Sequence, residues 1–155
     1  MKYNNTTAVF PGSFDPFTVG HQDVAFRALN IFPKLIIAIG ENSLKKSFFS
    51  LQKKIEIIQN TFKNDNRISV CSYSGLTVDF CKQKSCNIII RGIRNATDFY
   101  NEEIIAQANK YLENDIETIF LLSLPQHSYI SSSLIREIYA CKGNIDGLLP
   151  KGIIL

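Results

Sequence analysis

A segment near the start of the chain joins an apolar run to a helical pattern and contains the side chains of a phosphate site. It reads Phe10-Pro11-Gly12-Ser13-Phe14-Asp15-Pro16-Phe17-Thr18-Val19-Gly20-His21. The first turn of a helix leaves backbone N–H groups unpaired at the positive end of the helix dipole, and both features attract anions. The combination of Ser13, Gly20 and His21 at such a helix start therefore indicates a bound phosphate, to which His21 supplies a directional donor.

Three other residues of this segment have a simpler interpretation. Prolines restrict the backbone, and an aspartate in a turn commonly accepts hydrogen bonds from nearby backbone N–H groups. We interpret Pro11, Asp15 and Pro16 as residues that shape the turn, with Asp15 accepting local backbone bonds.

Two arginines follow another apolar run, in the sequence Ile88-Ile89-Ile90-Arg91-Gly92-Ile93-Arg94. Guanidinium groups bind phosphate oxygens through paired N–H donors, so arginines in a crevice indicate an anionic ligand. The alternative is that Arg91 and Arg94 form salt bridges with Asp98 or Glu102.

A lysine pair and a serine run offer further donors. Lys45 and Lys46 follow Gly40, but the second glycine that a Walker-type loop has before its lysine is lacking, so this segment is not such a loop. The lysine pair could bind a phosphate or could lie in a solvated loop. Ser131, Ser132 and Ser133 precede a helical pattern that includes Glu137, which fits an N-cap or hydroxyl donors for a phosphate.

Short aliphatic runs alternate with segments of helical period along the chain. The runs predict strands over 8–10, 35–39, 68–71, 88–90 and 118–122, and the periodic segments predict helices over 21–30, 51–62, 77–84, 97–112 and 132–141. Strands that are apolar on both faces are typical of parallel sheets covered by helices on both sides. The sequence therefore predicts an α/β fold: a Rossmann-like, doubly wound, five-stranded parallel sheet. Its ligand crevice should lie beyond the carboxyl ends of the strands, where the polar segments above begin.

Composition limits the remaining possibilities. A length of 155 residues predicts a single domain over 1–155, and a net charge of +3 is too small to indicate a nucleic-acid partner. The four cysteines show no zinc spacing and are interpreted as reduced thiols, which favours the cytoplasm. Because no apolar run reaches the ~18 residues of a membrane span, we expect no membrane insertion.

The motifs together resemble a known family. The first segment is similar to the nucleotidyltransferase pattern G-(S/T)-F-D-P-x-x-x-G-H, and residues 130–137 are similar to the pattern I-S-S-S-x-(I/V)-(R/K)-E. With Arg91-Gly92-Ile93-Arg94, the chain from Val9 to about Pro150 resembles the bacterial phosphopantetheine adenylyltransferases of the nucleotidyltransferase superfamily. The resemblance implies transfer of the adenylyl group of ATP to 4'-phosphopantetheine, with Mg²⁺ accompanying ATP, in a homo-oligomer of hexamer type.

The resemblance also implies roles for individual residues. Those implied as catalytic are Ser13, His21, Lys45 and Arg94. Those implied to bind ATP are Ser13, Phe14, His21, Gly92, Ile93, Arg94, Glu102, His127, Ser128, Tyr129, Ile130, Ser131, Ser132 and Ser133. Those implied to bind the acceptor are Ser13, Lys45, Leu76, Thr77 and Arg91.

Two alternatives stay open at this point. The first motif is shared across the superfamily, so the acceptor could be another one, such as nicotinate mononucleotide or, with CTP, glycerol phosphate. A chain of a different class, a non-catalytic nucleotide-binding module, would need the phosphate-binding helix starts but not Lys45 and Arg91.

Overall fold

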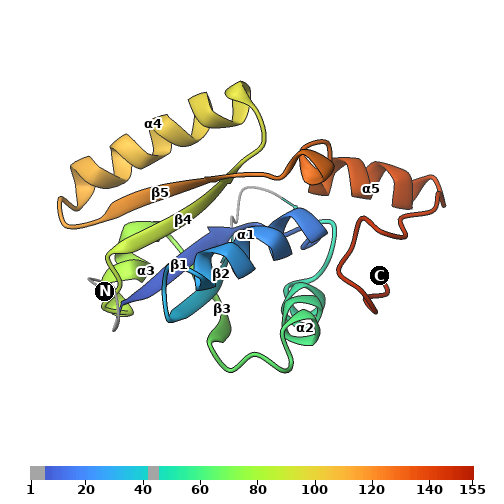
Figure 1. Cartoon of the computed structure of the whole chain (residues 1–155), viewed down its shortest axis with the longest axis horizontal. Coiled ribbons are helices and arrows are strands. Elements are labelled where there is room, and N and C mark those ends of the chain that lie inside the picture. Colours follow the sequence, from blue (N-terminus) through green and yellow to red (C-terminus); the bar gives the residue numbers. More distant parts are fainter. Residues whose placement is uncertain (1–5, 42–45) are drawn as a thin grey trace.

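The fold is a five-stranded parallel sheet flanked by helices (Figure 1). A computed structural model describes residues 6–41 and 46–155. The strands lie in the order β3-β2-β1-β4-β5 and every paired neighbour is parallel. Their bounds are Thr7–Gly12 (β1), Lys34–Glu41 (β2), Ile68–Ser74 (β3), Ile88–Ile93 (β4) and Glu117–Leu122 (β5). The predicted α/β class and the parallel five-stranded sheet are confirmed.

Each α-helix occupies a segment in which helical period was expected, whereas the short 3-10 helix was not predicted. The α-helices are Val19–Leu29 (α1), Leu51–Thr61 (α2), Thr77–Gln83 (α3), Ala96–Leu112 (α4) and Ser132–Ala140 (α5), and a short 3-10 helix spans Pro125–His127 (η1). Hydroxyl or amide side chains accept backbone N–H bonds at the starts of four of them: Thr18 for α1, Ser50 for α2, Asn95 for α4 and Ser131 for α5. These caps satisfy N–H groups that a helix start leaves unpaired.

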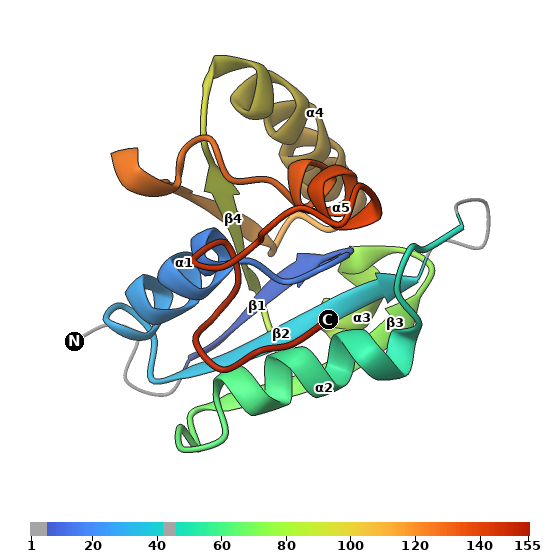
Figure 2. The same ribbon diagram turned by 90° about the vertical axis from the view of Figure 1, so that its right-hand side faces the viewer.

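Apolar side chains bury both faces of the sheet, as predicted. On one face, α1 and α2 contribute Ala25, Ala28 and Ile58 to a core with inward residues of β1 and β2. On the other, Val78 and Cys81 of α3 pack against Val9 and Ala38. In Figure 2, α1 and α2 lie on the near side of β1 and β2, and α3 lies behind them.

The last residues of the chain return to the core. The carbonyl of Leu148 accepts a hydrogen bond of 3.1 Å from the backbone N–H of Val19. Ile153 and Leu155 then pack against the buried cluster that α1 and α2 share with the sheet. The C-terminal segment therefore covers part of the face that carries α1 and α2, as Figure 2 shows.

Four strands extend further than the sequence predicts. The expected ends at Phe10, Ile39, Cys71 and Ile90 lie two or three residues short of the observed ends of β1, β2, β3 and β4. Arg91 and Gly92 are therefore part of β4 and do not follow it, which corrects the prediction. Backbone pairing with β5 continues from Arg91↔Phe120 to Ile93↔Leu122, and such pairing does not require apolar side chains.

Strands β1 and β4, which are neighbours in the sheet, separate before they end. β1 pairs with β4 only at Ala8↔Ile88 and Val9↔Ile89, although β1 stays paired with β2 as far as Gly12↔Ile39. The strand order also reverses between β1 and β4, and doubly wound sheets bind ligands at this kind of switch point.

Candidate functional site

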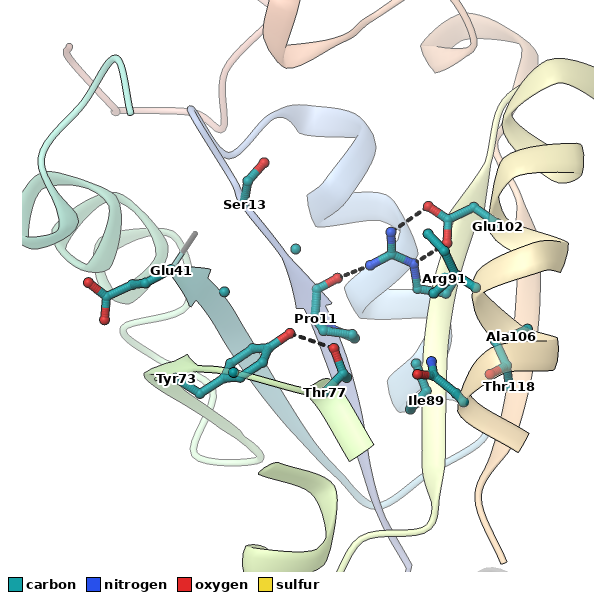
Figure 3. Close-up of a pocket in the computed structure, with 15 residues that line it drawn as sticks. Pro11, Ser13, Glu41, Tyr73, Thr77, Ile89, Arg91, Glu102, Ala106 and Thr118 are labelled. Atoms are coloured by element: carbon teal, nitrogen blue, oxygen red, sulfur yellow. Dashed lines mark hydrogen bonds and ion pairs between the residues drawn. The ribbon is translucent and has the colours of Figure 1, made fainter. Parts of the chain in front are cut away.

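Two cavities meet where β1 and β4 separate. The first, of about 450 Å³, extends toward β3 and α4, and we call it the α4 cavity (Figure 3). The second, of about 280 Å³, extends toward the starts of α1 and α5, and we call it the α5 cavity. Five residues line both: Pro11, Gly12, Ser13, Arg91 and Glu102. The chain therefore provides two adjoining compartments with a shared wall that contains an arginine.

His21 lies in the first turn of α1 and lines the α5 cavity. Thr18 caps the helix: its hydroxyl accepts a bond of 3.2 Å from the His21 backbone, and its own backbone N–H donates to His21 Nδ1 at 3.0 Å. Since Nδ1 accepts a hydrogen bond, the proton of the neutral ring is assigned to Nε2. The capping box thus fixes the orientation of the imidazole as well as its tautomer.

The surroundings of His21 disfavour its charged form. The ring centroids of Phe14 and Phe17 lie 5.1 and 5.3 Å from that of the imidazole. Burial, followed by the charges of Arg91 and Arg94, lowers the pKa of His21 from 6.5 to about 3. At neutral pH the ring is therefore an uncharged N–H donor at the helix start.

Both motif arginines are held by carboxylates of α4. Arg91 donates to both carboxylate oxygens of Glu102 and to the carbonyl of Pro11, as Figure 3 shows. Arg94 donates to Asp98 at 2.7 and 3.0 Å and to the carbonyl of Ile130 at 3.4 Å. The salt-bridge alternative is therefore realised, with Glu102 for Arg91 and Asp98 for Arg94.

These ion pairs leave donor capacity at the site. Within the described residues, each arginine uses three of the five N–H groups of a guanidinium, so two remain. The carboxylates also fix the planes of the guanidinium groups, which reduces the entropy lost when a ligand binds. The pairs are thus compatible with anion binding.

The start of α5 also lines the α5 cavity. Ser131 caps the helix by accepting a bond of 3.1 Å from Leu134, and the Ser132 hydroxyl donates to the carbonyl of Pro16 at 2.8 Å. His127 of η1 also lines this cavity, and its buried Nδ1 has no hydrogen-bond partner among the described residues. A buried polar atom without a partner is costly, so this nitrogen is a candidate ligand contact.

The α4 cavity has a different lining. Its wall includes the apolar side chains of Ile89, Ile105 and Ala106. Its polar groups include Tyr73 and Thr77, whose hydroxyls lie 2.8 Å apart (Figure 3). This compartment suits an elongated ligand with an apolar arm and a few polar groups.

Most residues singled out from the sequence lie in one of the two cavities. Those that line the α5 cavity are Ser13, Phe14, Gly20, His21, Arg91, Gly92, Arg94, Glu102, His127, Ile130, Ser131, Ser132 and Ser133. Those that line the α4 cavity are Ser13, Thr77, Arg91 and Glu102. Four others line neither cavity: Leu76, Ile93, Ser128 and Tyr129. Lys45 lies outside the described residues, and Lys46 is exposed.

Sequence reasoning missed several lining residues and one long-range contact. Glu41, Tyr73 and Asn109 line the α4 cavity. The signal for Asn109 was its spacing from Glu102 and Ala106, which places all three on one face of a helix. The expectation that Asp15 accepts local bonds is wrong, because its carboxylate accepts from Phe48 and Phe49 at 2.8 and 2.9 Å. Residues so far apart in the sequence form no local pattern from which this contact could be predicted.

The structure also describes the cysteines and the lengths of the helices. All four cysteines lie in the described part of the chain and are free thiols. Across residues 6–41 and 46–155, no helix combines the length and apolar character needed to cross a membrane.

Comparison with known proteins defines the class of this fold and site. A family model described as cytidylyltransferase-like matches residues 9–138. The phosphopantetheine adenylyltransferase of Cytophaga hutchinsonii is 48% identical over 143 residues, covering 92% of this chain and 95% of the relative. The enzyme of that name from Flavobacterium psychrophilum is 46% identical over 146 residues, with 94% and 96% covered. That from Nautilia profundicola is 42% identical over 149 residues, with 96% and 97% covered.

These matches extend over nearly all of the chain, including both cavities. The fold is that of a cytidylyltransferase-like nucleotidyltransferase domain. Within that class, the chain belongs to the phosphopantetheine adenylyltransferase family.

Proposed function

We propose that this protein transfers the adenylyl group of ATP to 4'-phosphopantetheine, giving dephospho-coenzyme A and pyrophosphate. The observation that carries the proposal is the meeting of the two cavities at Arg91. ATP would occupy the α5 cavity, between two helix starts, and the pantetheine arm would occupy the α4 cavity. The two phosphoryl groups would then meet at the shared wall.

The reaction needs little proton transfer from the protein. A phosphate monoester has a second pKa of about 6, so the acceptor is largely dianionic at neutral pH. One of its oxygens attacks the α-phosphorus of ATP, and the bond from that phosphorus to the bridging oxygen breaks with its electron pair leaving on pyrophosphate. Glu102 and Asp98, the acidic residues that line the α5 cavity, are both paired with arginines and are not required as bases.

The protein would act by orientation and by electrostatic stabilisation. Two anionic reactants repel each other, and fixed donors offset that repulsion as charge spreads over the α-phosphoryl oxygens. His21 would donate Nε2–H to those oxygens, Arg94 and the starts of α1 and α5 would hold the phosphates of ATP, and Arg91 would hold the acceptor phosphate. By the family resemblance, Lys45 would assist Arg91.

Mg²⁺ is proposed to enter with ATP. Within the described residues, no three His, Cys, Asp or Glu side chains form a group that could hold a metal ion. The donor set of the α5 cavity instead suits phosphate oxygens, and Mg²⁺ is commonly held through such oxygens and water with few protein ligands. When bound, it would neutralise part of the phosphate charge.

Pyrophosphate release from the purified protein tests the proposal. ATP and CTP would each be offered with 4'-phosphopantetheine, nicotinate mononucleotide and glycerol phosphate. We expect release only with ATP and 4'-phosphopantetheine. Release with another acceptor would assign the chain to another nucleotidyltransferase activity, and ATP binding without any turnover would support a non-catalytic module.

The exposed face of α4 supports a homo-oligomer as part of the proposal. This helix has 17 residues, none of them buried in the single chain. Its exposed apolar side chains are Phe99, Tyr100, Ile104, Ile105, Tyr111 and Leu112. An apolar surface of this extent is typical of protein interfaces. We expect light scattering to give six times the 17.5 kDa of one chain; the mass of a monomer would contradict this.

A cytoplasmic location is also part of the proposal, and the four free thiols support it.

A further inference from the structure

Two hydroxyl groups line the α4 cavity on the side of β3 and α3. Tyr73 lies near the end of β3, and Thr77 is the first residue of α3. Their oxygen atoms are 2.8 Å apart, so one hydroxyl donates a hydrogen bond to the other, as Figure 3 shows. Among the described residues, neither hydroxyl has a second hydrogen-bond partner. We call these two groups the hydroxyl pair.

Neighbouring residues hold the hydroxyl pair in place. The Tyr73 ring stacks on the ring of Phe80 in α3, with centroids 4.7 Å apart and an angle of 26° between the planes. Gly40 of β2 also lines the cavity, and a Cβ atom added to it would lie 3.2 Å from the Tyr73 hydroxyl oxygen. Because glycine has no side chain, the space beside this oxygen stays open. The hydroxyl pair thus has a defined position on the cavity wall.

The hydroxyl pair has one donor left for a ligand. A hydroxyl has one hydrogen and two lone pairs, and the bond between Tyr73 and Thr77 uses one of the two hydrogens. Burial raises the pKa of the Tyr73 hydroxyl, so this group stays protonated and uncharged at neutral pH. An uncharged donor in a compartment with apolar walls suits an uncharged acceptor, such as the carbonyl of an amide.

The hydroxyl pair and the arginine of the shared wall lie in the same cavity but on different strands. Tyr73 belongs to β3 and Arg91 to β4, and in Figure 3 they lie on either side of Pro11 of β1. In the proposed reaction Arg91 holds the acceptor phosphate, and the arm of the acceptor occupies the rest of the cavity. The arm of 4'-phosphopantetheine contains two amides between its phosphate and its thiol, so an uncharged polar group is available to the hydroxyl pair.

We propose that Tyr73 and Thr77 form a recognition site for an amide of the acceptor arm, whose carbonyl accepts the remaining O–H of the hydroxyl pair. This inference rests on the proposed function and adds a basis for its specificity. Glycerol phosphate and nicotinate mononucleotide are phosphate monoesters without an amide. A site whose polar groups pair with the substrate rejects an analogue that leaves them unpaired.

The double variant Tyr73→Phe/Thr77→Val removes both hydroxyls and keeps the shapes of the two side chains. The ring that stacks on Phe80 is retained. Isothermal titration with 4'-phosphopantetheine in the absence of ATP measures binding without turnover. We expect the Kd to rise about five- to tenfold, the scale of losing one hydrogen bond. The Kd for ATP should change less than about twofold, and an unchanged Kd for 4'-phosphopantetheine would overturn the inference.

Analogues of the acceptor identify the group that is recognised, and they need only the wild-type protein if the double variant does not fold. In each of two analogues, one amide of 4'-phosphopantetheine is replaced by two methylene groups. We expect one analogue to bind the wild type about five- to tenfold more weakly than 4'-phosphopantetheine. The double variant should bind that analogue within about twofold of the wild type. Full affinity of the wild type for both analogues, or an equal loss in the double variant for all three ligands, would overturn the inference.

Tyr111→Phe/Thr97→Val is the matched control. It removes the same two groups from α4, at exposed positions that line neither cavity. We expect the Kd for 4'-phosphopantetheine to stay within about twofold of the wild type, and a rise equal to that of Tyr73→Phe/Thr77→Val would overturn the inference. If the wild type binds 4'-phosphopantetheine but forms no dephospho-coenzyme A, the proposed function fails and the binding data still test the hydroxyl pair. If it does not bind 4'-phosphopantetheine, both fail.

Discussion

The two cavities offer different groups to a ligand, although they share a wall. Two helices begin at the α5 cavity, and hydroxyl residues, Thr18 and Ser131, cap both of them. At the α4 cavity, α3 begins at Thr77, and the side chain of its N-cap residue, Leu76, makes no capping bond to the described residues. The α5 cavity thus offers backbone donors at helix starts, whereas the lining of the α4 cavity includes apolar and hydroxyl side chains; in the proposed reaction the first group holds phosphates and the second holds the longer arm. The contrast implies that substitutions can impair one substrate without the other.

His21→Ala should have the largest effect on turnover. Loss of a donor that acts on developing charge should lower kcat about 100- to 1,000-fold, with a much smaller change in either KM. Steady-state kinetics with each substrate varied in turn would measure this. Near-normal turnover would refute the proposed role of the imidazole.

Arg91→Ala should affect the affinity for one substrate more than the affinity for the other. We expect affinity for 4'-phosphopantetheine to fall about tenfold or more, because charge-assisted bonds to phosphate are lost, while ATP affinity is mostly spared. Arg94→Ala is the control, with the reverse pattern expected. Isothermal titration with each ligand would measure both affinities, and equal losses for both ligands would show that the division between the cavities is wrong.

The state of His21 predicts a pH dependence of stability. Its folded-state pKa of about 3 lies below the unfolded value of 6.5, so the unfolded chain binds more protons between these pH values. The free energy of unfolding should therefore fall as the pH decreases from 6.5 toward 3, by about 2 kcal/mol at pH 5 from this residue alone. Denaturant unfolding at pH 7.5 and pH 5 would measure the loss. His21→Gln should lose less over the same interval, and an equal loss in both proteins would contradict the assignment.

Ser131→Ala should have the smallest effect. Removing the cap of α5 costs about 1 kcal/mol of stability and should raise the KM for ATP a few-fold, since the N–H groups at the helix start become less well fixed. The KM for 4'-phosphopantetheine should not change. Thermal unfolding and kinetics together check this, and a rise confined to the acceptor would be inconsistent with the α5 cavity as the ATP site.

Local sequence was sufficient to predict the elements and most of the lining residues. Aliphatic runs such as 35–39 are buried inside a parallel sheet, and polar residues after them lie at its carboxyl edge. The ends of β1 and β4 were predicted too early, because pairing with a neighbouring strand extends Arg91 and Gly92 into the sheet. Strand register of this kind is a property of two segments and is not encoded in either alone.

Long-range contacts account for the rest. The bonds from Phe48 and Phe49 to Asp15 connect residues more than thirty positions apart, so a local turn was the natural but incorrect expectation. The face of α4 that lines the α4 cavity was accessible to sequence reasoning through the spacing of Glu102, Ala106 and Asn109. Tyr73 also lines this cavity, and it lies in the part of β3 that extends beyond the predicted strand end.

The most direct test of the central claim follows the α-phosphorus of ATP. The protein would be incubated with ATP labelled at that atom, with and without 4'-phosphopantetheine, and the products separated. The account predicts that the label enters dephospho-coenzyme A only when the acceptor is present, and that none enters pyrophosphate. Label that stays in ATP, or that is released as AMP without the acceptor, would contradict adenylyl transfer at the junction of the two cavities.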